Sequence, residues 1–214
     1  MKKSGFTLIE LMVVLTIISL GIFLLLRVRE RILLNETVNL FVADIRNAQF
    51  KTLSSTRYSG AIRCGYGIHD NYDDSTSYFV YVGNNASGAG VDCATQDRRF
   101  CGFAPGGQWE DDIQLLPLRK LFSPNFEFKG GVSDSNFGPI FFEPPYPTTF
   151  LCSPLTVYNC PPGLACGAAS TGLSLAPTII TIGYVGQTCA SAPCQSICVY
   201  TSGRIEVVSG TICP

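Results

Sequence analysis

The first 26 residues constrain this chain more than any other stretch. Two lysines, Ser4 and Gly5 precede a run from Phe6 to Leu26 that contains one charged residue, Glu10, and no proline. As an unbroken helix this run would extend about 31 Å, which is enough to cross the hydrocarbon core of a membrane. The sequence therefore predicts a transmembrane helix near the N-terminus.

A secretory signal peptide is the ordinary interpretation of a basic start followed by an apolar run. Three features oppose it. The apolar run is long for a signal core, no Ala-x-Ala site follows it, and an acidic residue lies near its start. A carboxylate inside a membrane costs at least about 2.5 kcal/mol, so Glu10 is a candidate functional residue. The other alternative is a plain single-pass anchor.

The segment Gly5-Phe6-Thr7-Leu8-Ile9-Glu10 resembles the class III signal of type IV pilins and of the pseudopilins of type II secretion. The resemblance implies that a prepilin peptidase cleaves after Gly5 and that the new N-terminal Phe6 is methylated. It also implies that Glu10 guides assembly into a filament. There, Glu10 would pair with the amine of Phe6 on a neighbouring subunit. In a low-dielectric setting, burying one charge of such a pair without the other is energetically costly. The pair would therefore fix the register between subunits.

The same resemblance implies partners and a location. Other pilin or pseudopilin subunits would contact the N-terminal helix, the prepilin peptidase and methyltransferase would process it, and an assembly ATPase and a platform protein would act on it indirectly. The subunit would start as a single-pass protein of the bacterial inner membrane with its head outside, then join a periplasmic or extracellular filament. The charges alone are ambiguous, because Lys2 and Lys3 favour a cytoplasmic N-terminus while Arg27, Arg29 and Arg31 follow the span.

Ten cysteines, all beyond the membrane segment, predict a disulfide-rich exported head with up to five bridges. A zinc site is the alternative, but it needs closely spaced pairs such as Cys-x2-Cys, and the chain has none. We therefore predict neither metal nor cofactor. Local spacing favours a Cys93–Cys101 bridge and two or three bridges among the six cysteines from Cys152 to Cys198. The candidate disulfide cysteines are Cys64, Cys93, Cys101, Cys152, Cys160, Cys166, Cys189, Cys194, Cys198 and Cys213.

Helical spacing continues beyond the membrane segment. Apolar residues recur at intervals of four, three, four and three, while the positions around them are polar or charged. The pattern predicts one continuous helix over residues 6–56, about 75 Å long, whose second half packs an apolar stripe onto a sheet. The stripe consists of Leu34, Val38, Phe41, Ile45 and Ala48.

Short segments that alternate apolar and polar residues, or are rich in β-branched and aromatic residues, follow the helix. They predict an α+β fold in which the long helix packs on a largely antiparallel, disulfide-rich β head, as in pilin-like proteins. The predicted parts are a leader at 1–5, a membrane-spanning half-helix at 6–26, an amphipathic half-helix at 27–57 and an exported head at 58–214. The predicted strands are Ala61–Ile68, Tyr78–Gly83, Ile113–Leu121, Phe126–Lys129, Pro139–Glu143, Thr178–Val185, Gln195–Thr201 and Arg204–Val208.

The end of the chain reads as a hairpin that turns at Ser202-Gly203. It resembles the closing hairpin of the H-type minor pseudopilins and of the T-type minor pilins. Some T-type members bind DNA through a Gly-Arg-x-Arg stretch. Here the stretch is Gly203-Arg204-Ile205-Glu206, so an acid replaces the second arginine. One arginine beside a glutamate is a poor phosphate clamp. The other interpretation is that Gly203 supplies a positive φ and Arg204 is a solvated or ion-paired turn residue.

Candidate catalytic chemistry is sparse. The single histidine, His69, has no Gly-x-Ser-x-Gly partner motif, and the chain lacks a phosphate-binding loop. Asp70, Asp73 and Asp74 lack the spacing of a calcium loop and predict a solvated acidic loop. A net charge of −1 gives no basis for bulk binding to nucleic acid. We therefore predict a non-enzymatic, minor filament subunit. The alternatives are a filament-presented binding module, for example for DNA near Arg204, and an anchored enzyme.

Overall fold

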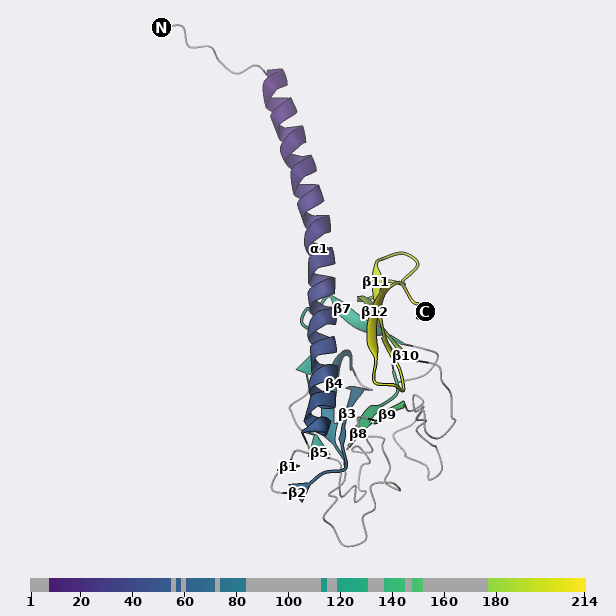
Figure 1. Ribbon diagram of the computed structural model, residues 1–214. Coiled ribbons are helices and arrows are strands. Elements are labelled where there is room, and N and C mark those ends of the chain that lie inside the picture. The colour runs from purple at the N-terminus through teal and green to yellow at the C-terminus, as the bar shows by residue number, and fades with distance from the viewer. Residues whose placement is uncertain are drawn as a thin grey trace.

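In this protein one long helix packs against a β-rich head (Figure 1). The helix projects from the head at its N-terminal end, and its second half lies against the strands. The computed structural model describes residues 8–54, 57–58, 61–71, 74–83, 113–114, 119–130, 137–144, 148–151 and 177–214.

Helix α1 spans Leu8–Leu53 without a break, about 69 Å for its 46 residues. Glu10 lies in its first turn and Lys51 in its last turn, where each charge complements the helix dipole. The predicted continuous helix is thus confirmed over the described residues.

The apolar stripe of α1 forms the centre of the core. All five predicted stripe residues are buried. Phe41 lies at their middle and packs edge-on against Tyr78 and Phe128, with ring centroids 4.7 and 5.1 Å apart, and also against Phe137. Since Tyr78 and Phe128 belong to strands of different sheets, this one ring joins the helix to both sheets.

The larger sheet has six strands in the order β5-β4-β3-β8-β9, and β6 also pairs with β4. All its pairings are antiparallel. Helix α1 contacts β3 and β8 of this sheet. The strands are β3 (Tyr66–Asn71), β4 (Asp74–Val82), β5 (Ile113–Gln114), β6 (Arg119–Lys120), β8 (Ile140–Glu143) and β9 (Thr148–Leu151).

A four-stranded antiparallel sheet in the order β12-β11-β10-β7 covers the rest of the helix face. Helix α1 contacts β10 and β11, and β7 contacts β4 of the larger sheet. The strands are β7 (Phe126–Lys129), β10 (Thr178–Tyr184), β11 (Cys194–Val199) and β12 (Ile205–Ser209). A separate pair follows the helix directly and consists of β1 (Arg57–Tyr58) and β2 (Ala61–Ile62).

Apolar residues cover both faces of the larger sheet. Along β4, Tyr78 and Val80 join the core beneath α1, whereas the alternate residues Phe79 and Tyr81 belong to a second buried cluster. Successive side chains of a strand point to opposite faces, so this second cluster lies on the face turned away from the helix. Phe141 and Phe150 complete it.

The predicted β segments are found with several corrections. The segment predicted as one strand from Ala61 to Ile68 is divided between β2 and β3, with Arg63 to Gly65 between the two strands. Of the predicted segment Ile113–Leu121, the structure describes β5 (Ile113–Gln114) and β6 (Arg119–Lys120), and residues 115–118 lie outside the described residues. Strands β1 and β9 were not predicted. The strand expected to stop at Pro144 does end beside it, at Glu143.

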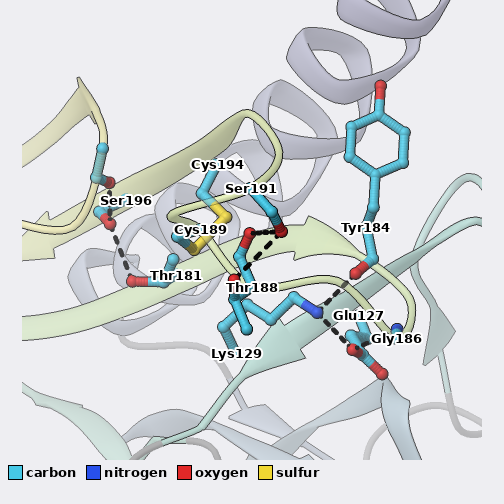
Figure 2. The surroundings of a disulfide bond; sticks show 11 residues. Glu127, Lys129, Thr181, Tyr184, Gly186, Thr188, Cys189, Ser191, Cys194 and Ser196 are labelled. Carbon is cyan, nitrogen blue, oxygen red and sulfur yellow. Dashed lines mark hydrogen bonds and ion pairs between the residues drawn. A yellow bond between two sulfur atoms is a disulfide. The ribbon is translucent and has the colours of Figure 1, made fainter.

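A partly buried ion pair fastens β7 to its neighbours (Figure 2). Lys129 donates to the Glu127 carboxylate and, over 2.5 Å, to the backbone oxygen of Tyr184. Glu127 also accepts from the backbone N–H of Gly186 and from the Ser75 hydroxyl. Burial raises the pKa of Glu127, but the hydrogen bond from Lys129, the Gly186 N–H, the Lys129 charge and the Ser75 hydroxyl together bring it below its ordinary value of 4.5. The pair therefore ties β4, β7 and the turn after β10 together.

Replacing Glu127 by glutamine is expected to destabilise the head by about 1 kcal/mol at neutral pH, because the charge-assisted bonds are lost. A carboxyl with a lowered pKa in the folded state stabilises the fold above its unfolded-state pKa, and this contribution disappears as the pH falls through the folded-state value. Denaturant unfolding of wild type and Glu127→Gln should thus differ fully at pH 7, and the difference should disappear as the pH falls below 4.5 and through the lowered folded-state pKa of Glu127. A difference that does not change from pH 7 down through this acidic range would contradict this role of the Glu127 charge.

Candidate functional site

The N-terminal half of α1 is an apolar surface that the head does not cover. The large apolar side chains between Leu8 and Leu26 are each about half exposed or more. The most apolar window of the helix has a mean hydropathy of 2.7, and none of it is buried. By length and composition this segment could cross a membrane. An exposed apolar face of this size calls for a lipid or protein partner.

Glu10 is exposed in the first turn of this segment, with apolar residues around it. An acidic group at a helix N-terminus is electrostatically favoured there, but in a lipid or protein interior its charge would need a partner. The predicted cleavage and methylation positions, Gly5 and Phe6, lie outside the described residues. Their roles and that of Glu10 stay predictions.

Two disulfide bonds cross-link segments of the four-stranded sheet and its connections. Cys189 pairs with Cys194 across the turn between β10 and β11, as Figure 2 shows, and Cys198 pairs with Cys213. The first bridge lies inside the predicted group of six cysteines. Cys198 pairs outside that group, with a cysteine nearer the C-terminus, which excludes three bridges within the group and leaves the option of two.

The remaining candidate cysteines divide into two sets. Cys64 is buried and disulfide-bonded. The others lie outside the described residues, and so does the predicted Cys93–Cys101 bridge: Cys93, Cys101, Cys152, Cys160 and Cys166.

His69 and Asp70 are buried within β3. The solvated acidic loop predicted here is thus wrong for Asp70, because β3 continues to Asn71 and pairs with β4. The Nδ1 atom of His69 lies 3.0 Å from the Asp70 carboxylate, and the imidazole ring stacks on Phe79. Both side chains are packed inside the sheet, where a substrate has no access to them.

Arg204 follows the turn of the predicted C-terminal hairpin. Gly203 has a φ of +81°, which confirms its predicted conformation. The Arg204 guanidinium lies 4.0 Å from the centre of the Tyr200 ring, and its Nε is 3.4 Å from a carboxylate oxygen of Glu206. Arg204 is therefore an ion-paired turn residue, and Glu206 competes with any phosphate for it.

Sequence reasoning missed one feature with functional potential, a groove between α1 and β12. It is lined by helix residues such as Arg46 and Gln49 and by Gly203 and Ile205, which lie about 150 positions later in the chain. No local motif could indicate it, because the pairing of these segments exists only in the folded chain.

One comparison with known proteins is informative. Residues 1–26 match the family model described as the prokaryotic N-terminal methylation motif. No curated protein and no solved structure matches the chain. The match supports a type IV pilin-like prepilin signal at the N-terminus. Together with the exposed apolar helix, it suits a pilin-like protein anchored in the inner membrane.

Proposed function

We propose that this protein is a minor structural subunit of a type IV pilus or a type II secretion pseudopilus. The observation that carries the proposal is the division of α1. Its motif-bearing first half is apolar and exposed, while its second half is built into the core of the head. A helix of this kind can leave the membrane only by exchanging lipid for other apolar helices.

We expect the subunit to pass through two stages, first in the inner membrane and then in the filament. In the inner membrane, residues 6–26 span the bilayer and the prepilin peptidase removes residues 1–5 and methylates Phe6. The assembly ATPase and platform protein then move the helix into a filament, where Glu10 pairs with the amine of a neighbouring Phe6. The disulfides support an oxidising compartment for the head.

A minor position in the filament is supported by the resemblance of the closing hairpin to minor subunits. The alternative of a DNA-binding module rests on Arg204, and the contact of Arg204 with Glu206 opposes it. An anchored enzyme has no supporting constellation among the described residues.

The proposal is tested by co-purification with filaments. In cells that carry a pilus or pseudopilus assembly system, the full chain should be recovered in the sheared-filament fraction. Deleting the prepilin peptidase should retain the chain in the membrane fraction. Recovery of the chain in the filament fraction without the peptidase, or its absence from that fraction with the peptidase, would contradict the proposal.

A further inference from the structure

Two pockets lie where α1 faces the segments around β12, and Figure 1 shows where these elements lie in the head. We refer to the two pockets together with the edge of β12 between them as the groove. One end, of about 390 Å³, is lined by Arg46, Gln49, Gly203 and Ile205. Gln49 donates a hydrogen bond of 3.2 Å to the Gly203 oxygen and fixes the distance between helix and hairpin at this end.

The other end of the groove, of about 400 Å³, is lined by Arg31 and Asn35 of the helix and by Ser209 and Gly210 at the end of β12. The turn between β10 and β11 and the start of β11 also line it, for example with Pro193. Strand β12 therefore runs antiparallel to α1. The eight residues from Gly203 to Gly210 and the helix from Arg31 to Arg46 each cover about 23 Å, so the two segments have matching lengths.

The helix side of the groove is cationic. Arg31 and Arg46 are exposed and share one face of α1 with the polar residues Asn35 and Gln49, since their spacings of 4, 11 and 3 return to the same side. The nearest acidic residues of the helix lie about 80° or more around the helix axis from each of these four residues: Glu30, Glu36 and Asp44. On β12 the side chains that face the helix are Ile205, Val207 and Ser209, and Val207 is 43% exposed.

The strand side of the groove is an open sheet edge. Within the described residues no strand pairs with the outer edge of β12. The backbone oxygen of Arg204 and the N–H of Gly210 bond to β11. Because an antiparallel ladder alternates, the backbone groups of Ile205, Val207 and Ser209 point outward, away from β11. These groups are a template for an added strand.

We propose that this groove binds an extended, acidic segment of another exported protein, which adds as a strand to the edge of β12. Apolar side chains of the segment would lie on Val207, and carboxylates would face Arg31 and Arg46. These arginines are about 22 Å apart along the helix, which corresponds to acidic residues about six to eight positions apart in an extended chain.

A second copy of this protein is a less suitable donor of the segment. None of the described strands carries two acidic residues at that separation. The described strands thus offer no matching donor, which favours a different protein, either another filament component or a protein that the filament carries. This inference goes beyond assembly through α1, since the groove lies wholly in the head.

The probe is a labelled synthetic peptide that presents Glu, Val, Val and Glu on alternate residues, with threonine between them. The full chain is held in detergent micelles, and binding is followed by fluorescence anisotropy and by amide hydrogen exchange. We expect the peptide to protect the outward N–H groups of Ile205, Val207 and Ser209, whereas protection of Glu206 and Val208, which already bond to β11, should not change.

Four variants sharpen the test. Val207→Pro removes one outward N–H at an edge position that tolerates proline, and it should weaken binding about tenfold. Val207→Thr keeps this N–H and should bind like wild type. Arg31→Ala and Arg46→Ala should each weaken binding about threefold to fivefold.

The matched control is the same peptide with lysine in place of glutamate, which should not bind. Equal binding of the two peptides, tighter binding of double-stranded DNA than of the acidic peptide, or absence of protection at Ile205, Val207 and Ser209 would overturn the proposal. None of these outcomes bears on filament assembly, so the two proposals can fail separately.

Discussion

Replacing Glu10 by alanine is expected to reduce recovery of the protein in filaments about a hundredfold, while the chain still inserts into the membrane. The expected loss follows from the environment of the carboxylate. Glu10 is surrounded by exposed apolar side chains, so in a filament core it would face a low-dielectric interior. Removing one partner of a buried ion pair leaves the other charge uncompensated, which costs about 3–5 kcal/mol. Without Glu10, the amine of a neighbouring Phe6 would carry that cost.

The measurement is the ratio of protein in sheared filaments to protein in membranes. Glu36→Ala is the matched control, because Glu36 is an exposed glutamate of the same helix beyond the apolar segment. It should leave the ratio near the wild-type value. Equal filament recovery of Glu10→Ala and wild type would remove the assembly role of Glu10 and favour a simple membrane anchor.

Replacing Phe41 by alanine is expected to destabilise the head by about 3–5 kcal/mol. The Phe41 ring is 1% exposed and contacts aromatic rings from both sheets, so its removal leaves a cavity where helix, β4 and β7 meet. Phe50 offers a matched control on the same helix, since its side chain is 68% exposed. Phe50→Ala should change the stability by no more than about 0.5 kcal/mol.

Denaturant unfolding with the disulfides intact measures both changes. A similar loss for Phe41→Ala and Phe50→Ala would show that the core is not centred on the predicted helix stripe. A small effect of Phe41→Ala alone would mean that the two sheets close over the cavity.

The helix and its core stripe could be predicted because their signal is local. The spacing from Leu34 to Ala48 defines one helix face whatever the rest of the chain does. The candidate N-terminal site is local for the same reason, as residues 1–26 carry the whole motif. The closing hairpin was also predictable, because Gly203 lies at the position that needs a positive φ.

Features that depend on distant pairings were not predictable. Strand β9 is short and follows a proline-rich stretch, so its own residues give a weak signal. Asp70 reads as part of an acidic loop, yet pairing of β3 with β4 buries it. The partner of Cys198 and the groove beside β12 depend on how the hairpin docks on α1, which no single segment encodes.

The mature N-terminus tests the central claim most directly. The full chain would be purified from membranes of cells with and without a prepilin peptidase, and its terminal peptide identified by mass spectrometry. We predict a chain that begins at Phe6 and carries one additional methyl group, and only when the peptidase is present. A chain that still begins at Met1 in the presence of the enzyme, or one cut beyond Leu26, would contradict the filament account.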